Sequence, residues 1–126
     1  MAQQPLNTYK TVTGIVSTTD TEVYKTKTGY TSIVLYAQVA NTGVGVGTVT
    51  FYHQRETRSQ SGISTTKTEL IKNAPIPQND TIVLLEGRLV LERTALKTDS
   101  IRMVGISSVV PNTLKYTVSI LETLNQ

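Results

Sequence analysis

The chain has 126 residues, a length typical of one domain, and it contains no cysteine, which excludes disulfides and thiolate metal sites. Its formal net charge is +3, with lysines and arginines scattered instead of gathered into the basic stripe of a nucleic-acid-binding protein. No apolar run approaches the roughly 18 residues that cross a bilayer, and the first residues lack the apolar stretch of a signal peptide. We therefore expect synthesis in a cytoplasm and neither nucleic acid nor membrane as a partner.

Threonine is the most common residue, and valine supplies much of the apolar content. Both residue types favour strands, threonine on exposed faces and valine on buried ones. No segment shows the 3.6-residue apolar spacing of an amphipathic helix over three turns. The sequence predicts an all-β fold.

Residues 1–8 are expected to form an irregular arm, because Pro5 blocks regular strand pairing. Two interpretations of the arm stay open: a frayed terminus, or a segment that lies on a neighbouring subunit. Residues 9–126 are predicted to form a single β-sandwich domain, which begins with strands at 9–16 and 21–27.

Residues 30–41 form the longest run that suits a buried strand, and we expect this strand to be central. Strict alternation places four apolar side chains on the face predicted to meet the core: Ile33, Leu35, Ala37 and Val39. The opposite face carries Val34, Tyr36 and Gln38 and is expected to be partly covered.

The glycine-rich run at 41–47 lacks the spacing of a nucleotide-binding loop and predicts a hairpin loop. Residues 48–54 follow as a strand with Val49 and Phe51 inward. The only histidine, His53, is expected to be exposed at the end of this strand, since no second ligand or catalytic partner has a recognisable spacing from it.

Residues 55–63 are polar and predict a hairpin loop or a mobile excursion, and strand character resumes at 64–72. Residues 73–80 predict an extended connector, because two prolines remove amide donors there. The apolar segments at 81–85 and 88–91 indicate either one strand bent by a bulge at Gly87 or two strands joined by a tight turn. Strands at 101–107 and 114–121 complete the chain, the last with Tyr116, Val118 and Ile120 on one face.

Eight or nine short strands at regular intervals are typical of two packed antiparallel sheets. The sequence therefore predicts a two-sheet antiparallel β-sandwich, of jelly-roll or immunoglobulin-like topology. The pattern does not distinguish these two topologies.

No arrangement of residues indicates catalysis, a metal site or a cofactor. The carboxylates are predicted mostly at strand ends and turns, where solvated acids belong, and no calcium loop or nucleophile elbow is present. We expect no enzymatic activity, because each catalytic mechanism lacks at least one necessary residue type.

Four segments resemble small β-sandwich virion proteins of tailed bacteriophages, particularly marine and cyanobacterial phages. The first runs from Val-Tyr-Lys-Thr at 23–26 through Gly29 to Thr-Ser-Ile-Val at 31–34, with Lys-Thr-Lys-Thr at 25–28 where those proteins have Val-Pro. The others are Gln-Val-Ala-Asn at 38–41, the proline segment at 73–80 followed by 84–92, and Val-Ser-Ile-Leu-Glu at 118–122.

The resemblance implies a non-enzymatic virion structural protein that is made in the host cytoplasm. We expect a capsid decoration (cement) protein that bridges major-capsid subunits and forms a homo-oligomer. The alternative is a neck, collar or tail component, including one that binds a host glycan at a fibre or baseplate. The residues expected to contact other virion subunits come from the arm, the 55–63 loop and the proline connector: Gln3, Gln4, Pro5, Leu6, Arg55, Arg58, Ile63, Pro75, Ile76 and Pro77.

Overall fold

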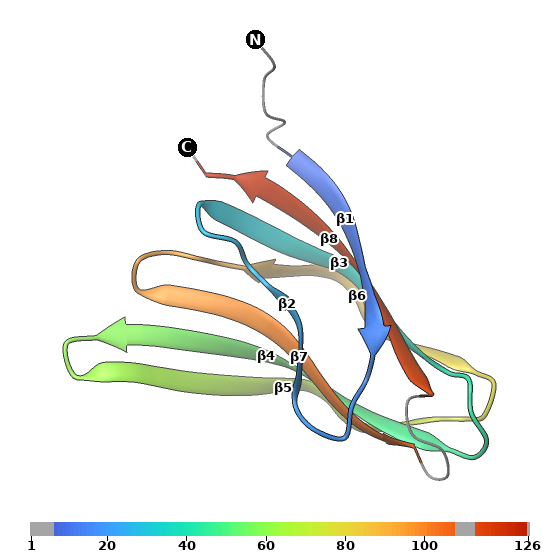
Figure 1. Cartoon of the computed structure of the whole chain (residues 1–126). Helices are drawn as coiled ribbons and strands as arrows, with labels where there is room; N and C mark the ends of the chain where they lie inside the picture. The colour runs from blue at the N-terminus through green and yellow to red at the C-terminus, as the bar shows by residue number, and fades with distance from the viewer. Residues whose placement is uncertain (1–6, 108–112, 126) are drawn as a thin grey trace.

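The computed structural model describes residues 7–107 and 113–125, which contain eight strands and no helix, and hence no helix that could span a membrane (Figure 1). The strands are β1 (Asn7–Ile15), β2 (Thr21–Lys25), β3 (Tyr30–Asn41), β4 (Gly47–Ser59), β5 (Gly62–Ile76), β6 (Thr81–Leu91), β7 (Lys97–Ser107) and β8 (Leu114–Leu124). The predicted all-β fold is confirmed.

The strands form two antiparallel four-stranded sheets. Sheet A has the order β1-β8-β3-β6 and sheet B the order β2-β7-β4-β5. Eight strands divided in this way between two sheets form a jelly roll, whereas an immunoglobulin domain has a different strand grouping. The structure thus decides between the two topologies that the sequence left open.

The core lies between the sheets and is built from the inward side chains of both. Sheet A contributes residues such as Val34, Val118 and Ile120, and sheet B contributes Phe51 and Met103, all of them fully buried. The inward side chains predicted for the strand at 48–54 are buried, and the shared face predicted for Tyr116, Val118 and Ile120 is the buried face of its strand.

The predicted core face of β3 is correct only in its second half. Ala37 and Val39 are buried, but Val34 is buried in place of Ile33 and Leu35, which are both partly exposed. The pairing of β3 with both neighbours shifts register between Val34 and Tyr36. This β-bulge adds one residue to the strand, so the alternation changes face at Leu35.

Two predicted loops are strands. Residues 55–59 belong to β4 and 62–63 to β5, so the expected 55–63 loop is only a tight turn at 60–61. β5 likewise continues through the expected connector as far as Ile76; Pro75 is accommodated because β5 is an edge strand. β1 starts at Asn7, within the expected arm, whereas residues 1–6 lie outside the described residues.

Residues 81–91 form one bent strand, β6, and not two strands joined by a tight turn. Its pairing with β3 is irregular between Glu86 and Leu89, and Gly87 has a φ of 131°, which favours glycine. The bend of β6 therefore lies opposite the bulge of β3.

Gly105 on β7 has no space for a larger side chain. A Cβ there would lie 2.8 Å from the carbonyl oxygen of Thr48 and 2.8 Å from a methyl group of Val16. We expect Gly105→Ala to lower the free energy of unfolding by about 1–3 kcal/mol, because backbone of the paired strand must move. Urea denaturation followed by circular dichroism measures this change, and an unaltered midpoint would contradict the tight packing of β7 on β4.

A candidate assembly surface

Four apolar side chains cross the outer face of sheet A in a single row, one on each strand. Backbone pairing places Tyr9 opposite Leu121, Leu121 opposite Ile33, and Ile33 opposite Val90. We call these four residues the apolar row. Tyr9 is 76% exposed and Val90 is 49% exposed, while Ile33 and Leu121 are partly exposed.

The row faces away from the core, because its neighbours along the two inner strands, β3 and β8, face inward. Ile120 and Glu122, on either side of Leu121, are buried, and Ser32 and Val34 flank Ile33 in the same way. The β-bulge at Leu35 produces this arrangement in β3. Sequence alternation assigned Ile33 to the core, and for that reason sequence reasoning missed the apolar row.

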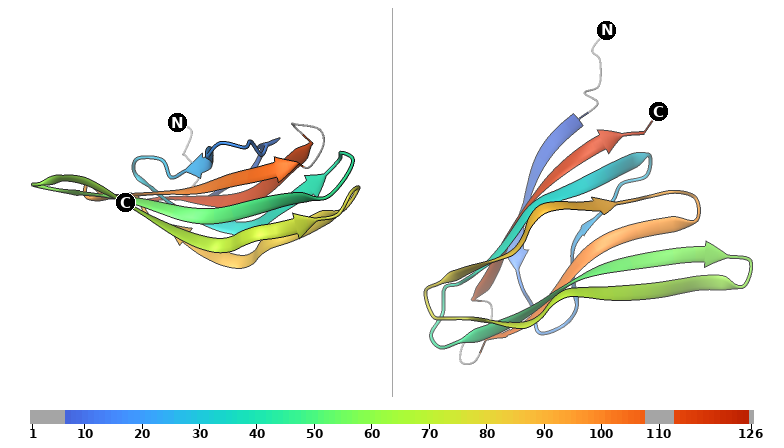
Figure 2. Two further views of the ribbon diagram at one scale, coloured as in Figure 1. Left: turned by 90° about the horizontal axis from the view of Figure 1, so that it is seen from below. Right: turned by 180° about the vertical axis from the view of Figure 1, so that it is seen from behind.

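A hairpin ribbon projects from one end of the sandwich. Its two strands are the paired ends of β4 and β5, from Arg55 opposite Thr66 to Ser59 opposite Gly62. Strand β7 still pairs with β4 as far as Thr57, so only the tip of the ribbon is two-stranded. The first nine residues of β5 are all exposed, and the back view shows the hairpin extending past the rest of sheet B (Figure 2). The ribbon presents Arg58 and Ile63, which are paired across its two strands, and Ile63 is 60% exposed.

An ionic cluster fixes the ribbon where it leaves the sandwich. The Arg55 guanidinium donates from Nε to Asp99 Oδ1 (2.7 Å) and from Nη2 to Asp99 Oδ2 (2.8 Å) and Glu92 Oε2 (2.8 Å). The amide of Glu92 also donates to Asp99 Oδ2 (2.9 Å), and His53 Nε2 lies 3.4 Å from the same oxygen. Asp99 is fully buried, so its charge depends on these partners.

The pKa of Asp99 is lowered from its ordinary value. Burial alone would raise this pKa, but hydrogen bonds from Arg55 and from the Glu92 amide, together with the charges of His53 and Arg55, outweigh it. The carboxylate of Asp99 is therefore ionised at neutral pH and contributes to stability there.

A second buried carboxylate connects the two sheets. Glu122 of β8 accepts hydrogen bonds from the hydroxyl of Tyr24 on β2 and from Lys27 Nζ (3.3 Å), while the Tyr24 hydroxyl also bonds Ser32 of β3 (2.8 Å). Burial, and then the hydrogen bond to Glu122, raises the pKa of Tyr24. The expectation that the acids are mostly solvated at turns is wrong for Asp99 and Glu122, which are both buried.

The expected contact residues divide into three groups. Arg58, Ile63, Pro75 and Pro77 are exposed, and residues 3–6 (Gln3, Gln4, Pro5 and Leu6) lie outside the described residues. Two expectations need correction: Ile76 is fully buried in the core, and the guanidinium of Arg55 is bound to Asp99 and Glu92. Neither side chain is available to a partner.

The expectation that His53 is exposed at a strand end is wrong. His53 lies in the middle of β4 and is largely buried beside Asp99. Within residues 7–107 and 113–125, no group of three histidine, aspartate or glutamate side chains is placed to hold a metal ion. Because its neighbours are ion-paired protein groups, we interpret the His53 cluster as structural.

Comparison with known proteins identifies structural likeness only. No protein-family model matches the sequence, and no curated protein matches it. A chain in the crystal structure of the T13 viral particle of infectious bursal disease virus matches 96% of this chain with a TM-score of 0.51 and 10% identity. A mutant VP2 protein of the same virus, in T=1 particles, matches 94% with a TM-score of 0.49 and 8% identity.

This chain spans about a third of the length of those viral chains, 32% in each case. At 10% identity, the likeness to the T13 particle establishes the fold. The class defined by strand order and comparison is therefore an eight-stranded jelly roll of the kind found in a chain of an icosahedral virus particle.

Replacement of Arg55 tests the ionic cluster. We expect Arg55→Met to lower the free energy of unfolding at pH 7 by about 2–3 kcal/mol, because Asp99 stays buried without its guanidinium partner. The stabilising contribution of a carboxylate with a lowered pKa is lost as pH falls through that folded-state pKa. The difference in free energy of unfolding between wild type and variant should therefore be smaller at about pH 3 than at pH 7. Urea denaturation at both pH values measures this difference.

Arg58→Met is the matched control, since Arg58 lies three residues away on β4 and binds no carboxylate among the described residues. We expect its effect to stay within about 0.5 kcal/mol. Other carboxyl groups titrate in all three proteins, so the comparison between variants isolates the two carboxylates that Arg55 binds, Asp99 and Glu92. Equal losses in the two variants, or a difference independent of pH, would contradict the role of the cluster.

Proposed function

We propose that this chain is a non-enzymatic structural subunit of a virion. The observation that carries the proposal is the jelly-roll strand order, shared with a chain of an icosahedral particle, in a domain with apolar side chains across its outer sheet face. Antiparallel sheets that face water usually carry polar side chains on the solvent side. The apolar row therefore supports a sheet face that is covered in an assembly.

The apolar row is too small to hold a partner by itself. Stable specific interfaces bury at least about 1,000 Å², far more than four side chains supply. Two further elements extend the contact: the arm at residues 3–6, which precedes β1 and thus Tyr9, and the projecting ribbon with Arg58 and Ile63. The exposed Pro75 and Pro77 are a third contact. Symmetric repetition of such contacts would turn weak binding into avidity.

Within this class, we propose a capsid decoration protein of a tailed bacteriophage, bridging neighbouring major-capsid subunits as a homo-oligomer. The sequence resemblance to small phage virion proteins supports this choice. A neck, collar or tail component is the alternative, and the same fold and surfaces suit it. Under both assignments the chain is made in the host cytoplasm and then becomes part of the virion.

A charge in the apolar row tests whether this face binds the shell. We expect Val90→Lys to reduce binding to capsid shells stripped of the protein by at least about tenfold, because an unpaired ammonium group would be buried at the contact. Co-sedimentation of the purified protein with the stripped shells measures the bound fraction. Stability should change by no more than about 0.5 kcal/mol, since residue 90 is half exposed.

Val44→Lys is the matched control. Val44 is 57% exposed in the loop between β3 and β4, and it is not part of the apolar row. This variant should bind the shells as wild type does. Equal binding by Val90→Lys and wild type would exclude the row from the interface, and a failure of wild type to bind any shell would contradict the decoration assignment.

A further inference from the structure

A hollow of about 430 Å³ lies where two turns of the sandwich meet the base of the ribbon. Its walls come from the β2–β3 turn, from β4, and from the segment between β6 and β7 with the start of β7. The lining residues are Thr28, Gly29, Arg58, Arg93, Thr94, Ala95 and Thr98. This volume lies within the range of small-ligand sites in proteins.

The two arginines of the hollow, Arg58 and Arg93, lack carboxylate partners among the described residues, unlike Arg55 and Arg102. Arg55 binds Asp99 and Glu92, and Arg102 binds Asp20 and Glu22. In contrast, the Arg93 guanidinium donates to a backbone carbonyl, and the Arg58 guanidinium makes no hydrogen bond or ion pair to any described residue.

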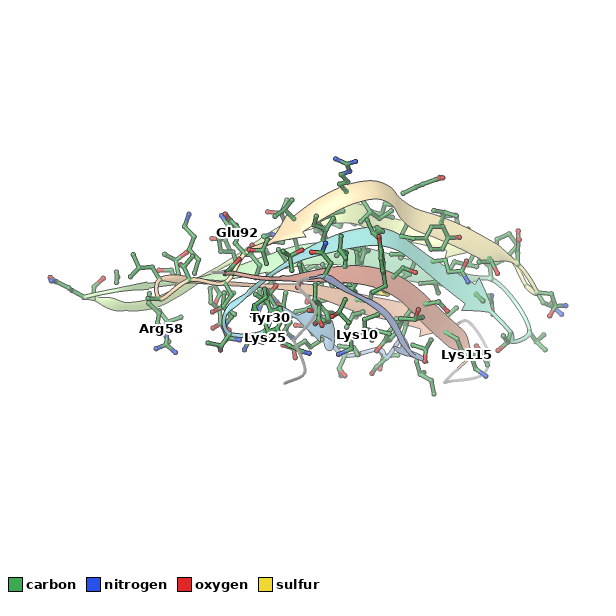
Figure 3. The ribbon with its side chains drawn as sticks, turned by 90° about the horizontal axis from the view of Figure 1, so that it is seen from above. Lys10, Lys25, Tyr30, Arg58, Glu92 and Lys115 are labelled. Atoms are coloured by element: carbon green, nitrogen blue, oxygen red, sulfur yellow. The ribbon has the colours of Figure 1, made fainter. Side chains whose placement is uncertain are left out.

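No carboxylate lines the hollow to balance these two charges. Glu92 is adjacent to Arg93 in sequence, but its side chain lies on the opposite side of the sheet from Arg58, where it binds Arg55 (Figure 3). Lys25 points to the same side of the sandwich as Arg58 but does not line the hollow (Figure 3). The hollow is therefore a positive site whose charge the protein leaves uncompensated.

The walls are held in place before any ligand arrives. Arg93 Nη1 donates to the carbonyl oxygen of Thr26 (2.9 Å), which fixes one guanidinium. The Thr94 hydroxyl accepts from the amides of Leu96 (3.2 Å) and Lys97 (3.1 Å), and the Arg58 amide donates to the Leu96 carbonyl (2.8 Å). Preorganised donors lower the entropic cost of binding.

We propose that this hollow binds an oxyanion, either a carboxylate or a phosphate, carried by a small polar ligand. Guanidinium groups match both anions with paired, charge-assisted hydrogen bonds. The hydroxyls of Thr28 and Thr98, which have no partner among the described residues, are placed to bond the remaining oxygens of the ligand. The site shares Arg58 with the ribbon contact proposed above, but its test needs only the purified chain and no virion partner.

Nuclear magnetic resonance titration of the full chain tests the site with three probes: inorganic phosphate, D-glucuronate and neutral D-glucose. We expect one or both anions to shift the amide signals of the lining residues, whereas glucose should not. Arg58→Gln should weaken anion binding by about tenfold, as the loss of a charge-assisted hydrogen bond predicts. The anion that binds more tightly identifies the source of the oxyanion.

Arg88→Gln is the matched control, because Arg88 is exposed on β6, makes no ion pair with a described residue and does not line the hollow. It removes the same charge and should leave the affinity unchanged. Equal weakening by both variants, signal shifts spread over lysines elsewhere, equal binding of glucose, or no binding at millimolar anion would each overturn the proposal. None of these results bears on attachment to capsid shells, so the two proposals fail separately.

Discussion

The arrangement of the sandwich depends on one extra residue in its central strand. β3 pairs with β6 on one side and β8 on the other, and both pairings shift register between Val34 and Tyr36. Without that shift, strict alternation would send Ile33 inward together with Ala37 and Val39. With it, the strand buries Val34 in its first half and Ala37 in its second, while Ile33 joins the outer row. The bulge thus sets both the core and the outer face of sheet A.

Two buried carboxylates constrain how the strands of the two sheets are placed. Asp99 fixes the base of the ribbon through Arg55, and Glu122 joins β8 to β2 through Tyr24. Buried ion pairs contribute little net stability compared with apolar packing, but breaking one is costly, because a charge is left without a partner. Their effect is therefore to specify which strands meet and where the ribbon leaves the sandwich.

The fold class followed from the sequence because period-2 apolar patterns and turn residues mark strands directly. The faces of β4 and β8 followed for the same reason, as Phe51 and Val118 show. The face of β3 did not, since alternation contains no signal for a bulge. The extent of the ribbon was also missed, because apart from Gly62 and Ile63 its residues are polar on both faces, which is typical of a loop. Pairing between exposed strands, not burial, forms it. The strong polarity of Arg55 and Asp99 likewise gave no sign that one would be buried against the other.

The candidate surfaces show the same limit. The apolar row joins residues 9, 33, 90 and 121, and the positive hollow joins residues 28, 58 and 93, which only the strand order of the jelly roll brings together. Quantitative mass spectrometry of purified virions from the source of this chain tests the proposed role most directly. A decoration protein predicts on the order of hundreds of copies per particle, whereas about six or twelve would indicate a neck or tail component. Absence of the chain from the particles would contradict the virion assignment.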